Sequence, residues 1–90
     1  MDTSEVGRLA RWAAQVASQV HPPIQTAAFP AGEGERVAVE LALAGRTRRV
    51  EIPYGSWVDY QDDPEWRGEW ERVIIRLAKL LILEADPEPR

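Results

Sequence analysis

Prolines at two points confine the long helices to the two ends of this chain. The segment His21-Pro22-Pro23 ends any helix that begins near the N-terminus, because a proline pushes the preceding residue out of the α region and removes a backbone donor. Asp63-Pro64-Glu65 marks the start of another helix, with Asp63 as N-cap, Pro64 at the first helical position and an acid in the first turn. Strands are therefore expected between these two points.

Residues 3–20 are predicted to form a helix with one apolar face. Thr3 or Ser4 is expected to be the N-cap, while the positive end of the helix dipole favours the acids at positions 2 and 5. Trp12 flanks the apolar face. The residues that form this face recur at three- and four-residue spacing, which is typical of a helix packed on a core; they are Val6, Leu9, Ala10, Ala13, Val16, Ala17 and Val20.

Three strands are predicted in the middle of the chain, over residues 24–29, 36–43 and 46–52, with a turn at 30–35. A two-residue loop at Ala44-Gly45 places Glu40 opposite Arg49, whereas a loop shifted by one residue places Glu40 opposite Glu51. Like charges directly opposite each other destabilise a strand pair, and opposite charges contribute about 0.2–1 kcal/mol. We therefore favour the first register. Residues 53–62 are expected to form a loop.

The second helix is expected to run from Asp63 to about Ala85, with a core face formed by Trp66, Trp70, Val73, Ile74, Leu77, Ala78 and Leu81. Ile75, Leu80, Ile82 and Leu83 widen this face beyond the stripe of roughly 100° that one core needs. We therefore predict a homodimer with Ile75 and Ile82 in its interface. The alternative is that the first helix and the loop aromatics cover these side chains.

The order of elements predicts a single α+β domain over residues 1–86, followed by a polar C-terminal tail at 87–90. Short links favour a helix-strand-strand-strand-helix arrangement, in which a three-stranded antiparallel meander carries both helices on one face. This order resembles double-stranded RNA-binding domains and the small toxins that share their topology. Those RNA-binding domains carry a Lys-rich phosphate-binding motif at the start of the second helix, where this chain has the acidic sequence of residues 63–69.

The residues that most enzymes and metal sites require are scarce. The chain has no cysteine, and its single histidine, His21, lies beside two prolines at a helix end. Gly32-Glu33-Gly34 lacks the lysine of a phosphate loop and reads as a hairpin turn. The carboxylates at 59, 62 and 63 do not have the spacing of a calcium loop. We therefore expect a protein without catalytic activity, metal or cofactor.

The ends and the apolar runs of the sequence bear on where the chain acts. No apolar run approaches the ~18 residues that a membrane span needs. The first five residues, Met1 to Glu5, are acidic and lack the layout of a signal peptide. The expectation is a cytoplasmic protein without membrane contact.

The stretch 54–71 is the most informative for function. It holds five of the seven aromatic residues and six acidic residues against one base, Arg67. Aromatic side chains surrounded by charged residues are typical of protein interfaces, and acidic residues around them favour a basic partner. Trp66 and Trp70 are expected in the core, and one of the rings at 54 and 57 could cover the sheet edge. The predicted partner-binding residues are Tyr54, Trp57, Asp59, Tyr60, Asp62, Glu65 and Glu69.

Basic side chains form a second group. Arg46, Arg48 and Arg49 cluster at the predicted hairpin tip, and a further three lie along the second helix at 72, 76 and 79. They could contact phosphates, so the alternative function is nucleic-acid binding by an arginine-rich hairpin, although the net charge of −4 counts against it. The favoured function is a small acidic protein that binds another protein, of the kind represented by phage inhibitors that imitate DNA. Arginine in place of lysine at ten of eleven basic positions is typical of GC-rich bacteria and their phages.

Overall fold

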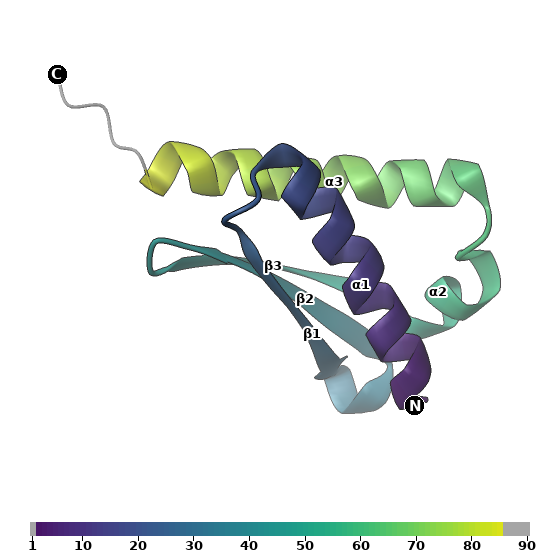
Figure 1. Ribbon diagram of the computed structural model, residues 1–90. Coiled ribbons are helices and arrows are strands. Elements are labelled where there is room, and N and C mark those ends of the chain that lie inside the picture. The colour runs from purple at the N-terminus through teal and green to yellow at the C-terminus, as the bar shows by residue number, and fades with distance from the viewer. Residues whose placement is uncertain (1, 86–90) are drawn as a thin grey trace, which may run out of the picture.

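The structure is a computed structural model that describes residues 2–85; the predicted tail at 87–90 lies outside the described residues. Figure 1 shows two long helices on the same face of an antiparallel sheet, which confirms the predicted fold class. One further helix follows the last strand. The elements in order are α1 (Thr3–Val20), β1 (Gln25–Ala31), the short 3-10 helix η1 (Gly32–Gly34), β2 (Arg36–Leu43), β3 (Arg46–Pro53), α2 (Tyr54–Tyr60) and α3 (Pro64–Ala85).

The cap of α1 differs from the prediction. Asp2, and not Thr3 or Ser4, is the N-cap: its Oδ1 accepts from the Ser4 backbone N–H at 2.9 Å and from the Ser4 hydroxyl at 2.8 Å. These two hydrogen bonds stabilise the ionised form and so lower the pKa of Asp2. The hydroxyl of Ser4 supports the cap rather than forming it. The helix ends before Pro22-Pro23, as predicted.

The sheet has the strand order β1-β2-β3 with both pairs antiparallel. Glu40 lies opposite Arg49, which confirms the register that charge pairing favoured. The loop between β2 and β3 has two residues, Ala44 and Gly45, and both have positive φ values of 54° and 80°. That geometry matches the twist of the flanking strands. The first strand is longer than expected, because its pairing with β2 continues to Ala31 opposite Arg36.

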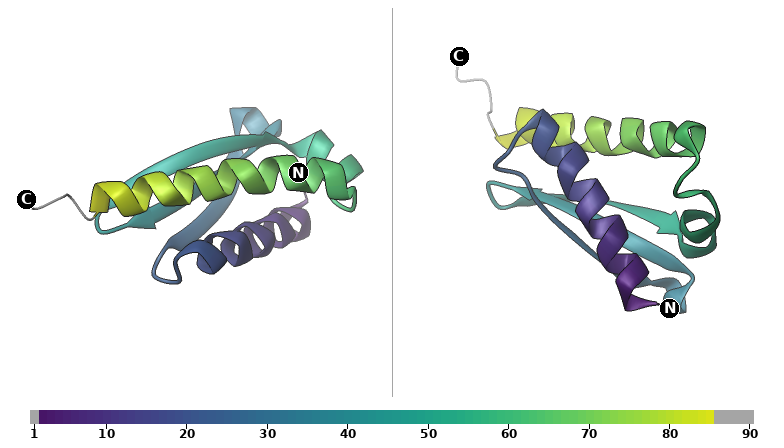
Figure 2. Two further views of the ribbon diagram at one scale, coloured as in Figure 1. Left: turned by 90° about the horizontal axis from the view of Figure 1, so that it is seen from above. Right: turned by 45° about the vertical axis from the view of Figure 1, so that its right-hand side comes forward.

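The core lies between the sheet and the two long helices. α1 covers β1 and part of β2, whereas α3 covers β3 and the other part of β2. Figure 2 shows the two helices side by side above the sheet. The largest side chains that are fully buried come from all these layers: Leu9, Leu41, Ile52, Ile74, Leu81, Val37 and Val39.

The loop predicted at 53–62 is wrong, because residues 54–60 form α2. This helix has no side-chain N-cap and carries a glycine at position 55, so the usual start signals are missing. It forms because tertiary contacts favour it: Trp57 is 3% exposed and packs in the core, and Tyr54 packs against the core from the same side. The local sequence contained one helical signal: Tyr54, Trp57 and Gln61 follow one another at three and four residues, which places them on one side of a helix.

Within residues 2–85, no helix is both long enough and apolar enough to cross a membrane.

Candidate protein-binding surface

A chain of tryptophans fixes the end of the molecule where α2 meets α3. Trp12 of α1 lies 5.8 Å from Trp57 of α2, which lies 6.1 Å from Trp66 of α3, and Trp66 lies 6.1 Å from Trp70, all between ring centroids. Tilted rings at these distances are favourable aromatic pairs. The predicted core role of Trp66 and Trp70 is confirmed in part, since both are half-buried and pack against the core. The rings hold three helices in one arrangement.

Glu5 ties α2 to α1 with two hydrogen bonds. Its Oε1 accepts from the indole N–H of Trp57 at 3.1 Å and from the side-chain amide of Gln61 at 2.9 Å. Arg8 lies 3.9 Å from the other carboxylate oxygen. Both hydrogen bonds join residues more than fifty positions apart, so nothing in the local sequence indicated them. They fix the α2–α3 connection that carries Tyr60.

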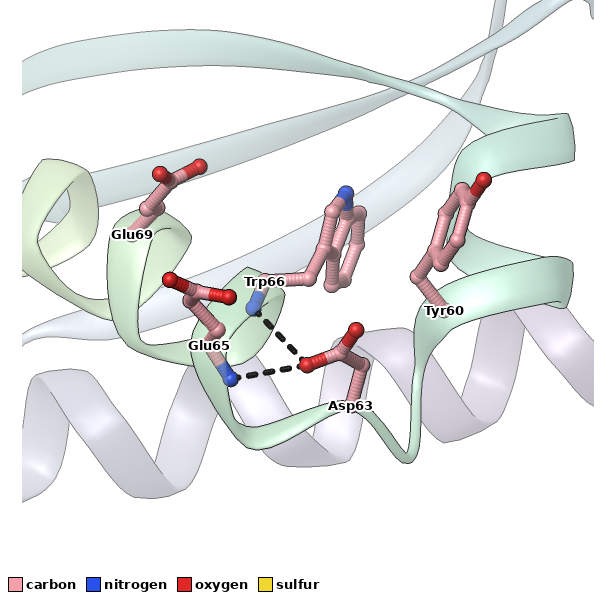
Figure 3. A pocket seen from close by; sticks show the side chains of 5 residues that line it. All are labelled: Tyr60, Asp63, Glu65, Trp66 and Glu69. Atoms are coloured by element: carbon pink, nitrogen blue, oxygen red, sulfur yellow. Dashed lines mark hydrogen bonds between the residues drawn. The ribbon is translucent and has the colours of Figure 1, made fainter.

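The α2–α3 connection forms a small hollow, here called the acidic hollow, lined by Tyr60, Asp63, Glu65, Trp66 and Glu69 (Figure 3). Tyr60 and Trp66 stand opposite each other with Asp63 at the gap between them, and Glu65 and Glu69 lie on the other side of Trp66. Asp63 caps α3 as predicted: its Oδ1 accepts from the backbone N–H of Glu65 at 2.9 Å and of Trp66 at 3.5 Å. The volume is about 200 Å³, below the 300–1,000 Å³ typical of small-molecule sites. The hollow therefore has room for a side chain.

The structure brings three of the predicted partner-binding residues together, namely Tyr60, Glu65 and Glu69. Tyr60 is 50% exposed, and both glutamates are exposed. Asp63 and Trp66 also line the hollow, and the sequence interpretation had placed them only as a cap and a core residue. That interpretation missed their second role because a cap and a half-buried ring can each present one edge to solvent.

Four other predicted residues lie elsewhere. Asp59 and Asp62 are exposed but do not line the acidic hollow; Asp62 borders a neighbouring one with Arg67 and Glu71. Trp57 is a core residue, so it cannot contact a partner as predicted. Tyr54 is half-buried, and its hydroxyl accepts from the backbone N–H of Asp2 at 3.1 Å. Both rings face inward because α2 turns that side toward the core.

The arginines of the hairpin do not converge on one surface. Arg48 forms an ion pair with Glu84 and so points toward α3. Arg49 lies on the opposite face of the sheet, 5.3 Å from the ring centroid of Phe29 and 3.1 Å from the carboxylate of Glu51. Arg46 is exposed at the start of β3. The alternating faces of the strand thus divide the predicted nucleic-acid contacts between two sides of the sheet.

No candidate metal site is found within residues 2–85, and no known protein matches this chain. Across residues 2–85, no group of three or more His, Cys, Asp or Glu side chains is placed to hold a metal ion. Comparison with protein-family models, with curated proteins and with solved structures finds no match to this chain. The candidate surface is therefore characterised by its own geometry and charge.

Proposed function

We propose that this chain is a non-enzymatic protein-binding domain whose acidic hollow accepts a lysine or arginine side chain of a partner protein. The observation that carries the proposal is a hollow lined by two rings, Tyr60 and Trp66, and by three carboxylates, with Asp63 at the gap between the rings and Glu65 and Glu69 on the other side of Trp66. A cation over an aromatic face gains about 0.5–2 kcal/mol, depending on how far it is desolvated. Carboxylates add charge-assisted hydrogen bonds.

The parts of the hollow have separate tasks. One oxygen of Asp63 is used by the N-cap of α3. Glu65 and Glu69 form no ion pair within residues 2–85, so their carboxylates can both receive donors from a partner. Trp66 is held by its neighbours Trp57 and Trp70. A site that is already ordered loses less conformational entropy on binding.

The charge around the hollow supports a short basic segment as the ligand. Asp59 and Asp62 extend the acidic surface along α2 and the turn after it. Farther along α3, exposed basic residues follow the acidic ones, namely Arg72 and Arg76. The acidic surface that these residues form thus ends partway along α3, which favours a single basic segment over a long imitation of the DNA backbone. An inhibitor of a basic protein remains one form that this proposed function could take.

Synthetic peptides test the proposal directly. The probe is a short Gly/Ser peptide with two central arginines, and the matched probe carries citrulline, which is uncharged, at those positions. We expect the arginine peptide to shift the Trp66 indole resonance and the amides of the hollow in NMR spectra, and the citrulline peptide to leave them unchanged. Tyr60→Ala and the double change Glu65→Gln/Glu69→Gln should each weaken binding about tenfold, a loss near 1.4 kcal/mol.

The control removes two negative charges elsewhere. Glu33 and Glu35 are exposed on and beside η1, so Glu33→Gln/Glu35→Gln matches the loss of charge without touching the hollow. Equal weakening by this control would mean that net charge alone attracts the peptide, and it would contradict the proposal. Tighter binding of duplex DNA or RNA, lost in the triple variant Arg46→Ala/Arg48→Ala/Arg49→Ala, would instead support the nucleic-acid alternative.

A further inference from the structure

The outward side of α3 carries a line of charged residues that the fold does not use. The line, here called the charged face, follows four- and three-residue steps along the helix, so its members share one side. This side is opposite to the buried residues Ile74, Ala78 and Leu81. Figure 2 (left) shows α3 from above, where no other element covers it. All of its members are exposed: the five charged residues are Glu65, Glu69, Arg72, Arg76 and Lys79, and the sixth member is Leu83.

The charges on this face are separated by sign. Glu65 and Glu69 are four residues apart, and so are Arg72 and Arg76; like charges at that spacing destabilise a helix by about 0.2–0.5 kcal/mol per pair. None of the five charges on the face forms an ion pair within residues 2–85. Glu69 and Arg72 are the one pair of opposite charges three residues apart on this face, and because they form no ion pair they do not offset the two like-charge pairs.

The helix dipole does not account for the separation either. Its effect is confined to the first and last turns. Only Glu65 lies in the first turn, and the last turn of α3 has no basic residue. Arg72 and Arg76 lie in the middle of the helix, where the dipole favours neither sign.

Apolar side chains accompany the basic half. Leu83 is 70% exposed, the highest value among the large apolar residues that are exposed. Together with Ile75 and Leu80 it lines a shallow groove of about 380 Å³ bordered by Arg72, Arg76 and Lys79. A group of apolar side chains with charged residues at its borders is a feature of interaction sites.

We infer that the charged face binds a second copy of this chain, with the two α3 helices antiparallel. A two-fold axis near Arg72 places Glu69 of one copy beside Arg76 of the other, and Glu65 beside Lys79. The same axis places Leu83 next to the aromatic side chains of the acidic hollow of the other copy. Every contact away from the axis then occurs twice, as a closed two-fold dimer requires. At the axis the two Arg72 side chains meet, so one repulsive contact stands against four attractive ones. The complementary charges are the observation that selects a second copy as the occupant.

This arrangement differs from a dimer centred between Ile75 and Ile82. Such a dimer would leave Glu65 and Glu69 without a base opposite them, and it would bring Arg76 and Lys79 of the two copies together, where like charges oppose association. Ile75 and Ile82 are also half-buried in the monomer, so they offer less free surface than Leu83. An anionic membrane is a weaker occupant for the face, because Glu65 and Glu69 lie on the same line as the bases.

The inference does not rest on the proposed function. Because both use Glu65 and Glu69, a second copy and a basic partner would compete for the same surface. The dimer is tested by the molar mass of the chain in solution at low salt, measured by light scattering after size exclusion. We expect twice 10.2 kDa at tens of micromolar for the natural chain. Glu65→Lys/Glu69→Lys alone and Arg76→Glu/Lys79→Glu alone should each weaken the dimer at least tenfold.

Mixing is the decisive arm of this experiment. An equimolar mixture of the two charge-reversed variants restores opposite charges at all four contacts between acids and bases, so we expect the mass of a dimer to return. Two control variants change the net charge equally at exposed sites outside the face, Glu33→Lys/Glu35→Lys and Arg11→Glu/Arg46→Glu. They should remain dimeric. Circular dichroism checks that each variant is folded.

Three results would overturn the inference. The first is a monomer at every concentration, and the second is a dimer that neither reversal weakens. The third is a mixture that stays monomeric although both variants are folded. Binding of the monomer to vesicles that contain phosphatidylserine, in place of self-association, would identify a membrane as the occupant. A monomer that still binds the arginine peptide would contradict the dimer and leave the proposed function standing.

Discussion

The two sides of α3 show opposite relations between sequence and fold. On the inner side Ile74, Ala78 and Leu81 are fully buried, and each contacts the core that the sheet and α1 provide. On the outer side, the acidic residues lie in the first turns of the helix and the basic residues come after them, and Leu83 is 70% exposed. The inner side is explained by burial of apolar surface. Solvation explains why the outer side is charged, and we assign the separation of its charges by sign and the exposure of Leu83 to binding.

The largest expected effect separates the two sides by stability. Leu81→Ala should lower the free energy of unfolding by about 2–5 kcal/mol, because it leaves a cavity at a fully buried position. Leu83→Ala, two residues along the same helix, should change it by less than about 0.5 kcal/mol. Urea denaturation of dilute protein measures both. Equal losses would show that Leu83 contributes to the core, and the contrast between the two sides would fail.

A pair of glutamates extends the comparison to charged residues. Glu5→Ala should destabilise the chain by about 1–3 kcal/mol, because the buried indole N–H of Trp57 loses its acceptor. Glu69→Ala should have almost no effect on the monomer, since Glu69 has no partner within residues 2–85. Chemical denaturation gives the stabilities, and tryptophan emission reports on Trp57. A stable Glu5→Ala variant would contradict the network.

A smaller effect tests whether the basic half of the charged face is unfavourable in one copy. Arg76→Gln removes the repulsion with Arg72 and should raise the free energy of unfolding of dilute protein by about 0.2–0.5 kcal/mol. The same change should weaken the dimer. Stability is compared at low and at high salt, where the gain should fade. A loss of monomer stability would mean that Arg76 supports the fold.

The smallest expected effect concerns the cap of α1. The folded-state pKa of Asp2 lies below its usual 3.8, so its ionised form contributes stability above pH 3.8, and this contribution is lost as the pH falls through the lowered pKa. In Asp2→Asn the cap remains but does not titrate. The natural chain should therefore be slightly more stable than Asp2→Asn near neutral pH, and the difference should vanish in acid. A difference that grows in acid would contradict this reading.

Much of the fold was predictable because local signals and tertiary packing agree. Pro22 and Pro64 mark the helix boundaries, and the charges of Glu40 and Arg49 select the hairpin register. α2 was not predictable in this way, because seven residues with a glycine and no side-chain cap form a helix only when the core accepts Trp57. The local sequence does not contain that information, since the acceptor for Trp57 is Glu5, 52 residues away.

The candidate site divides along the same line. Tyr60, Glu65 and Glu69 were predictable because acids and rings close together in sequence remain close on one connection between helices. Trp57 and Tyr54 were assigned to the surface because the sequence does not show which side of α2 faces the core. The separation of charge along α3 is visible in the sequence, but its exposure is not.

A nitroxide at position 83 tests the central claim most directly. The chain has no cysteine, so Leu83→Cys labels a single exposed site. The spin-labelled variant, which contains nitrogen of natural isotope abundance, is mixed with ¹⁵N-labelled natural protein. Only contacts between copies then broaden the detected amide signals. The antiparallel dimer predicts broadening around Tyr60 at the end of α2 and Glu65 at the start of α3, at the far end of α3 from the label. No broadening at micromolar concentrations, or broadening confined to the last turns of α3, would contradict the account.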